Sequence, residues 1–147
     1  MLDLLVNIDV DDSSRAVKFY TEAFGLRVGR RFGDAGVELL GAPVPLYLLV
    51  KAAGTLPFAG APGARSYQRH WTPVHLDFVV QDIHAALARA QAAGAICEGQ
   101  VHEHAWGKLA LLADPWGNGL CLLQFVGRGY DQLVEGSGVR DEAADGA

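Results

Sequence analysis

Histidine, cysteine and aspartate are the side chains of this sequence best suited to chemistry, and some of them are spaced to act together. His75 and Asp77 are two residues apart, so on a β-strand their side chains share one face. His75 could act there as a general base, and Cys121 could act as a nucleophile. A buried cysteine is more often an inert small apolar residue, which is the alternative interpretation of Cys121.

A second histidine pair, His102 and His104, has the same two-residue spacing. A displaced divalent metal site could therefore use His75, Cys121, His102 or His104 as ligands. Histidines on an exposed strand edge give the same pattern without any metal. We therefore expect no cofactor, and a divalent metal is the alternative.

Aromatic residues supply a second kind of candidate site. Trp71 and Trp106 lie on or beside predicted turns and favour a binding pocket, whereas Trp116 is expected to plug its turn. An aromatic ring that stacks on a planar ligand contributes about 1 kcal/mol. Residues 65–71 interleave Arg65 and Arg69 with aromatic rings, so this segment could cover an anionic or aromatic ligand.

Composition limits the classes of partner. The 147 residues are half apolar and one-fifth charged, which is the balance of a soluble globular protein. The net charge of -5 and the absence of a basic run disfavour nucleic acid. The longest apolar stretch, 44–50, is far shorter than the roughly 20 residues that span a bilayer, so no membrane partner is expected. The N-terminus does not resemble a signal peptide, so we expect a cytoplasmic protein with Cys97 and Cys121 reduced.

The apolar periodicity predicts one succession of elements twice. Each half has a strand, then a helix that begins at an aspartate (Asp12 or Asp82) and ends at a glycine (Gly25 or Gly94), then three more strands. The fold class is therefore α+β. The predicted strands are 4–10, 26–32, 36–40 and 46–51 in the first half, and 74–80, 96–103, 108–112 and 120–126 in the second.

The chain divides at a stretch rich in glycine and proline. Residues 1–51 form a first module and residues 74–130 a second. Residues 52–73 are a linker or a lid over a site, because a structureless stretch of this length is unusual inside a compact domain. Residues 131–147 are small and polar, and we expect them to form a flexible tail.

Three short segments carry a family resemblance: residues 12–20 with Gly25 and Leu26, residues 75–80, and the run Asp-Pro-Trp-Gly-Asn at 114–118. With these three segments in this order, the chain resembles the vicinal oxygen chelate superfamily. That group includes glyoxalase I, bleomycin-resistance proteins, extradiol dioxygenases and fosfomycin-resistance enzymes. The resemblance implies two βαβββ modules whose curved mixed sheet forms a cup, with the helices on the convex face. It also implies a homodimer.

Metal-dependent members of this superfamily place a histidine, glutamate or glutamine on the first and last strand of each module. The matching positions here are Leu5, Tyr47, His75 and Cys121, so only His75 keeps a usual ligand type. The resemblance therefore implies a glyoxalase- or bleomycin-resistance-like protein that binds a small hydrophobic or aromatic molecule without the family metal. The alternative is a lyase, isomerase or dioxygenase-like enzyme that uses a displaced divalent metal or His75 as base.

The predicted ligand-binding residues all fall on the face of the strands that would look into the cup, or on turns beside it. They are Asn7, Tyr47, Leu49, Trp71, His75, Asp77, Trp106, Cys121, Leu123 and Phe125. A third possibility is a structural or partner-binding module with no ligand. The polar residues at positions 75 and 77 favour a ligand site over that possibility.

Overall fold

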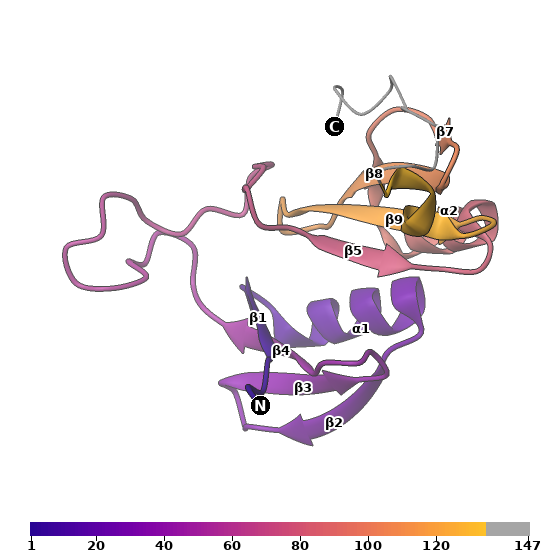
Figure 1. Cartoon of the computed structure of the whole chain (residues 1–147). Helices are drawn as coiled ribbons and strands as arrows, with labels where there is room; N and C mark the ends of the chain where they lie inside the picture. Colours follow the sequence, from indigo (N-terminus) through magenta and orange to yellow (C-terminus); the bar gives the residue numbers. More distant parts are fainter. Residues whose placement is uncertain (135–147) are drawn as a thin grey trace.

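A computed structural model of the chain describes residues 1–134, and it contains the predicted succession of elements (Figure 1). The first module consists of β1 (Val6–Val10), α1 (Ser13–Phe24), β2 (Arg27–Arg31), β3 (Gly36–Leu40) and β4 (Leu46–Val50). The second consists of β5 (Leu76–Val79), α2 (Ile83–Ala93), β6 (Ile96–Cys97), β7 (His102–His104), β8 (Gly107–Ala113) and β9 (Gly119–Phe125). A short 3-10 helix, η1 (Gly129–Leu133), follows.

The helix boundaries agree with the predicted caps. The Asp12 carboxylate accepts a hydrogen bond from the backbone N–H of Arg15, and Asp82 accepts from two N–H groups in the first turn of α2. Gly25 and Gly94 end the helices with φ of 68° and 116°, a conformation that other residues rarely adopt. The predicted strand 96–103 is divided into β6 and β7, and Gly99 with φ of 103° lies at the break.

Each module has its own mixed sheet. The first has the order β1-β4-β3-β2, and the second has the order β5-β9-β8-β6 with β7 also paired to β8. β1 runs parallel to β4 with Asn7 opposite Tyr47, and β5 runs parallel to β9 with Asp77 opposite Cys121. The α+β class, with two helices and two mixed sheets, is therefore confirmed.

The curved cup that the resemblance implied is not formed by the described residues. Both sheets are open and uncurled, and β1 and β5 are the outer strands where the two modules meet. A cavity lies between these two strands, so their backbones do not join the sheets into one.

One hydrophobic core joins the modules through their helices. α1 and α2 contact each other, and the ring of Phe24 in α1 stacks on Phe78 in β5 with ring centroids 4.0 Å apart. The Trp116 side chain is fully buried, and its indole N–H donates to the Asp11 carboxylate at 2.8 Å. Trp116 therefore plugs its turn, as predicted, and also ties the second module to the start of α1.

The segment between the modules has two parts. Residues 52–64, which we call the arm, stand away from the body of the molecule (Figure 1). Residues 65–73, which we call the strap, run back along the line where the modules meet. Leu56 and Phe58 on the arm have exposed fractions of 52% and 63%.

One further element follows β9. η1 occupies residues 129–133, where we predicted the start of a flexible tail; residues 135–147 of that tail lie outside the described residues. Neither α1 nor α2 has the length and apolarity that crossing a membrane requires, and the same holds for every helix in residues 1–134.

Candidate functional site

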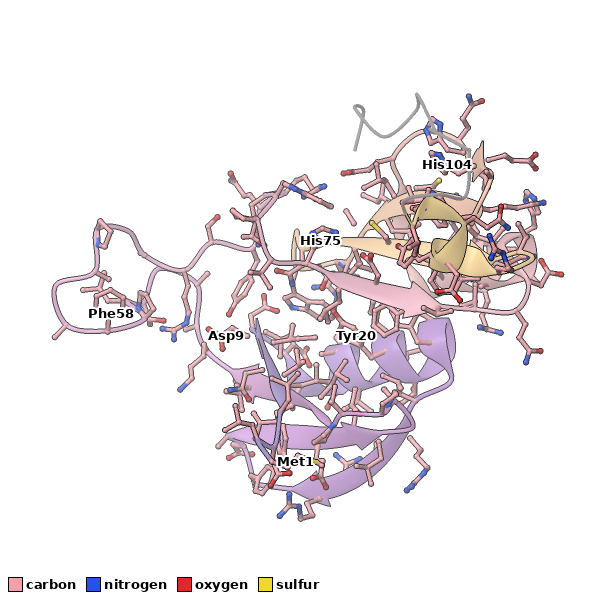
Figure 2. The ribbon with its side chains drawn as sticks, viewed as in Figure 1. Met1, Asp9, Tyr20, Phe58, His75 and His104 are labelled. Atoms are coloured by element: carbon pink, nitrogen blue, oxygen red, sulfur yellow. The ribbon has the colours of Figure 1, made fainter. Side chains whose placement is uncertain are left out.

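One candidate site is a cavity of about 540 Å³ between β1 and β5, which we call the seam pocket. Figure 2 shows Asp9 and His75 on the two sides of this seam, with Phe58 far out on the arm. The lining residues are Val6, Asn7, Ile8 and Asp9 of β1, Tyr20 of α1, Arg65, Ser66, Tyr67, His70 and Thr72 of the strap, Val74, His75 and Leu76 at β5, and Asn118, Gly119 and Leu120.

Ion pairs fix both arginines of the strap. The Nε of Arg65 donates to the Asp9 carboxylate at 2.7 Å, and its Nη1 donates to the Leu56 carbonyl at 2.8 Å. Arg69 forms a two-pronged pair with Glu98, which lowers the pKa of the Glu98 carboxyl below its ordinary value. Both guanidinium groups that we expected near a ligand are therefore neutralised by carboxylates of the chain itself.

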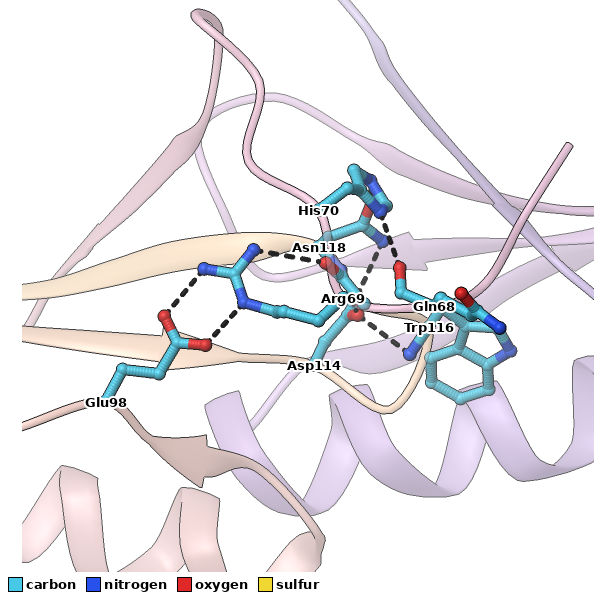
Figure 3. A network of polar contacts seen from close by, with 8 residues as sticks. Gln68, Arg69, His70, Glu98, Asp114, Trp116 and Asn118 are labelled. Carbon is cyan, nitrogen blue, oxygen red and sulfur yellow. Dashed lines mark hydrogen bonds and ion pairs between the residues drawn. The ribbon is translucent and has the colours of Figure 1, made fainter. Parts of the chain in front are cut away.

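The turn between β8 and β9 holds the strap from below (Figure 3). The buried Asp114 carboxylate accepts from the Tyr20 hydroxyl at 2.7 Å, from the backbone N–H groups of Trp116 and Asn118 at 2.9 Å, and from the Asn118 amide at 2.8 Å. Burial, together with the Asp114 charge, raises the pKa of Tyr20 well above its ordinary value. His70 then joins the strap to this network through Asn118 Oδ1 at 2.9 Å.

A second group of polar side chains lies on the open face of the second sheet. His75 Nε2 is 3.3 Å from Asp77 Oδ1, and the possible metal-ligand atoms of His75, Asp77 and Cys121 all lie within 4.8 Å of one another. The Trp71 ring lies over the His75 ring, with centroids 4.7 Å apart. The structure thus brings together four of the residues that we predicted from the sequence.

The Cys121 thiol is held in its neutral form. It is 3% exposed, and burial, followed by the charge of Asp77 and a hydrogen bond to it, raises the pKa of the thiol to about 12. Because the thiolate is the nucleophile, this environment argues against covalent chemistry at Cys121 in the metal-free chain. His102 and His104 lie on β7 and do not belong to the group formed by His75, Asp77 and Cys121.

Three other predicted residues pack together beside this group. Trp106 and Leu123 are buried in a small cluster with Cys121, and the Phe125 ring lies 6.1 Å from Trp106. Tyr130 of η1 covers them, with ring centroids 5.0 Å from Trp106 and 4.7 Å from Phe125. Sequence reasoning missed Tyr130, although an aromatic residue just after Gly127 and Gly129 was a signal that the chain turns back.

The open face of the first sheet carries a different cluster, made of Arg30, Glu38 and Tyr47. Arg30 donates to both Glu38 oxygens, and the Tyr47 hydroxyl donates to Glu38 at 2.8 Å and accepts from Arg30 at 2.7 Å. These bonds, with that from the Arg30 backbone N–H, lower the pKa of Glu38 to about 2. Of the predicted residues, Tyr47 and Leu49 thus lie on β4 of this sheet and do not line the seam pocket, whereas Asn7 and His75 both line it.

Sequence reasoning also missed Arg30 and Glu38. The signal was a glutamate within the apolar strand Gly36-Val37-Glu38-Leu39-Leu40, since a buried carboxylate needs a partner. The partner lies on the neighbouring strand, where Arg30 also donates its backbone N–H to Glu38 at 3.0 Å.

Comparison with known proteins decides the family. A family model described as a glyoxalase-like domain matches residues 5–123. The chain belongs to the glyoxalase-like family. The resemblance seen in the sequence is therefore confirmed, and the search of curated proteins gave no match.

Solved structures share the fold of this glyoxalase-like chain at low sequence identity. A glyoxalase/bleomycin resistance protein/dioxygenase family enzyme from Burkholderia phytofirmans PsJN is 20% identical, with a TM-score of 0.65 over 85% of this chain and 100% of that one. TnmS3, an antibiotic binding protein from Streptomyces sp. CB03234, is 25% identical, with a TM-score of 0.60 over 86% and 97% of the two chains. FosX, a fosfomycin resistance protein from Listeria monocytogenes, is 14% identical, with a TM-score of 0.65 over 86% and 96%.

The residues of this glyoxalase-like protein do not fit the metal site of its metal-dependent relatives. Leu5 has no ligand atom, and the Tyr47 hydroxyl is bonded to Arg30 and Glu38. His75 and Cys121 lie together on the second sheet, but Asp77 is their third partner and occupies none of the four family positions. A metal here would therefore need a displaced set of ligands.

Proposed function

We propose that this protein binds a small hydrophobic or aromatic molecule in the seam pocket, without the family's metal. The observation that carries this proposal is a cavity of about 540 Å³ that is lined by Asn7 from the first module, by His75 from the second and by residues of the strap. Pockets for small molecules span about 300–1,000 Å³, so the volume is suitable. We further propose that the protein acts as a homodimer, as the family resemblance implies.

The lining favours a ligand that is mainly apolar with a few polar atoms. Val6, Ile8, Leu76 and Leu120 supply apolar surface from both modules. Asn7, His75 and Asn118 supply hydrogen-bonding groups at defined positions, which is the usual composition of a small-molecule site. The antibiotic binding by TnmS3 is a property of that protein, and it supports the same class of function here.

A pocket-filling variant tests this proposal. Asn7→Phe places a ring in the seam pocket, and Ile96→Phe adds a ring at an exposed position on β6 outside it. We expect the fluorescent aromatic dye anilinonaphthalene sulfonate to bind the native protein and Ile96→Phe equally, and to bind Asn7→Phe at least about tenfold more weakly. Equal affinity for all three proteins would place the dye elsewhere and contradict the proposal.

The group formed by His75, Asp77 and Cys121 favours a second candidate function. Imidazole nitrogen, thiolate sulfur and carboxylate oxygen are the ligands of zinc, and catalytic zinc sites commonly have three protein ligands. A metal bound there would supply a Lewis acid for a lyase, isomerase or dioxygenase-like reaction. The proton on Cys121 competes with the metal, because the pKa of that thiol is raised to about 12.

Elemental analysis separates the two candidates. The native protein and His75→Ala are purified without chelator and without a metal-affinity tag. We expect no stoichiometric divalent metal in either protein. One ion per chain that is lost in His75→Ala would reject the metal-free proposal and favour the enzyme with displaced ligands.

A further inference from the structure

His70 of the strap has an oxygen atom close to each of its ring nitrogens. Its Nδ1 is 2.9 Å from the Gln68 carbonyl oxygen, and its Nε2 is 2.9 Å from the Asn118 side-chain oxygen. A carbonyl oxygen only accepts hydrogen bonds. Nδ1 must therefore carry a proton for the first of these contacts to be a hydrogen bond.

The second contact depends on the orientation of the Asn118 amide, and Asp114 determines that orientation. The Asn118 nitrogen lies 2.8 Å from an Asp114 carboxylate oxygen, which already accepts from Tyr20. If the amide were rotated, its oxygen would face the carboxylate and both atoms would be acceptors. The Asn118 oxygen therefore faces His70, so Nε2 must also carry a proton to bond with it.

We propose that the imidazolium form of His70 latches the strap over the seam pocket, which makes His70 a positioning residue for the binding function proposed above. The imidazolium donates to Gln68 and to Asn118 together, whereas neutral imidazole can donate to only one of them. Histidine ordinarily titrates between about pH 5 and pH 8. Since the protonated form makes the additional bond, the latch weakens as the pH rises through this range.

The strap is placed so that its release would expose the pocket. Ser66, Tyr67, His70 and Thr72 line the cavity, and the strap packs directly against the turn between β8 and β9. A Cβ at Gly117 would be 2.0 Å from the Gln68 carbonyl oxygen, so only glycine allows this approach. The His70 backbone N–H also donates to the Gly117 carbonyl at 2.9 Å, and this amide reports whether the strap is attached.

Charged groups around His70 come from each neighbouring element. Asp114, behind Asn118, makes the amide a stronger acceptor toward His70. The charge of Arg69, next to His70 in sequence, is neutralised by Glu98. The other titratable or charged groups on the pocket wall are Asp9 and Arg65, which pair with each other, Tyr20, Tyr67 and His75.

Hydrogen exchange of the His70 backbone amide tests the latch. Its exchange rate is divided by that of Val80, whose N–H donates to the Leu123 carbonyl at 2.8 Å, because the ratio removes the pH dependence common to all amides. We expect the ratio to rise about fivefold between about pH 5.5 and about pH 8, as one hydrogen bond is lost. In His70→Gln the ratio should not change with pH, because the amide side chain does not titrate.

His102→Gln is the matched control, since it removes an exposed histidine on β7 and should leave the native pH dependence intact. NMR of the His70 ring nitrogens in the native protein gives a measurement that needs no variant. We expect protons on both nitrogens at about pH 5.5 while the amide is protected. An exchange ratio that does not change with pH in the native protein would overturn the latch. The same holds if the ratio in His70→Gln changes with pH as much as it does in the native protein.

The latch and the proposed function can fail separately. Amide exchange and ring NMR are recorded without any ligand, so they test the latch alone. If the exchange ratio responds to pH but the dye binds Asn7→Phe as well as the native protein, the latch stands and the binding proposal is rejected. If the ratio is flat while Asn7→Phe blocks the dye, the latch is rejected and the binding proposal stands.

Discussion

The open faces of the two sheets each carry a polar cluster, and the two clusters differ in character. On the first sheet, Glu38 is held by Arg30 and Tyr47, so its charge is neutralised and both of its oxygens accept hydrogen bonds. On the second sheet, Asp77 lies beside the His75 imidazole and the Cys121 thiol, and the three residues offer nitrogen, oxygen and sulfur atoms close together. Two modules with the same order of elements thus carry different clusters. The cluster of the first sheet stabilises the fold, and the cluster of the second sheet has atoms that can bind a ligand or a metal.

The strand register shows how this difference arises. Asn7 lies opposite Tyr47 in the first sheet, and Asp77 lies opposite Cys121 in the second. In the first module the carboxylate is on β3 instead, where an arginine on β2 can reach it. In the second module the carboxylate is on the outer strand β5, next to the seam pocket, and its neighbours are weaker donors than a guanidinium.

The largest effect that we expect concerns the thiol of the second cluster. Burial raises the pKa of Cys121 to about 12, whereas Cys97 is half-buried on β6. Iodoacetamide should therefore alkylate Cys121 in a Cys97→Ser variant at least about 100-fold more slowly than it alkylates Cys97 in Cys121→Ser, at about pH 8. The two rates should converge in denaturant. Comparable rates in the folded variants would show an available thiolate and restore Cys121 as a candidate nucleophile.

The next effect concerns acid stability, and it should be confined to the first cluster. The pKa of Glu38 is lowered from 4.5 to about 2, so its contribution to stability is present above about pH 4.5 and is lost as the pH falls toward 2. We expect urea unfolding of the native protein to show this loss and unfolding of Glu38→Gln to lack it. Glu22→Gln removes an exposed carboxylate from α1. In this variant the free energy of unfolding should change with pH as it does in the native protein. If the free energy of unfolding of Glu38→Gln had the same pH dependence as that of the native protein, the cluster would not be ionised as described.

The fold could be predicted from the sequence because its signals are local. Each helix begins at an aspartate and ends at a glycine, and these residues lie next to the apolar stripe of the helix in the sequence. They are Asp12 and Gly25 for α1, and Asp82 and Gly94 for α2. The break between β6 and β7 at Gly99 was harder to predict, because the sequence does not show which φ a single glycine in a polar stretch adopts.

The candidate site could be predicted only in part, since contacts between strands depend on register and on loop paths. His75 and Asp77 are two residues apart, and their shared face follows from the strand period. Glu38 and Arg30 meet across a pair of strands whose register shifts between Val28 and Arg31, which no local pattern shows. His70 reaches Asn118 across 48 positions, so its two acceptors could be recognised only in the structure.

The smallest effect compares two tyrosine hydroxyls, one on each face. Tyr47 makes two side-chain hydrogen bonds in its cluster, whereas Tyr130 covers Trp106 and Phe125 mainly with its ring. Tyr47→Phe should therefore lower the free energy of unfolding by about 1 kcal/mol, and Tyr130→Phe by no more than about 0.5 kcal/mol. Urea denaturation at neutral pH measures both. Because each change removes only an oxygen atom, a larger loss for Tyr130→Phe would mean that the second face is the more tightly bonded one and would reverse the comparison.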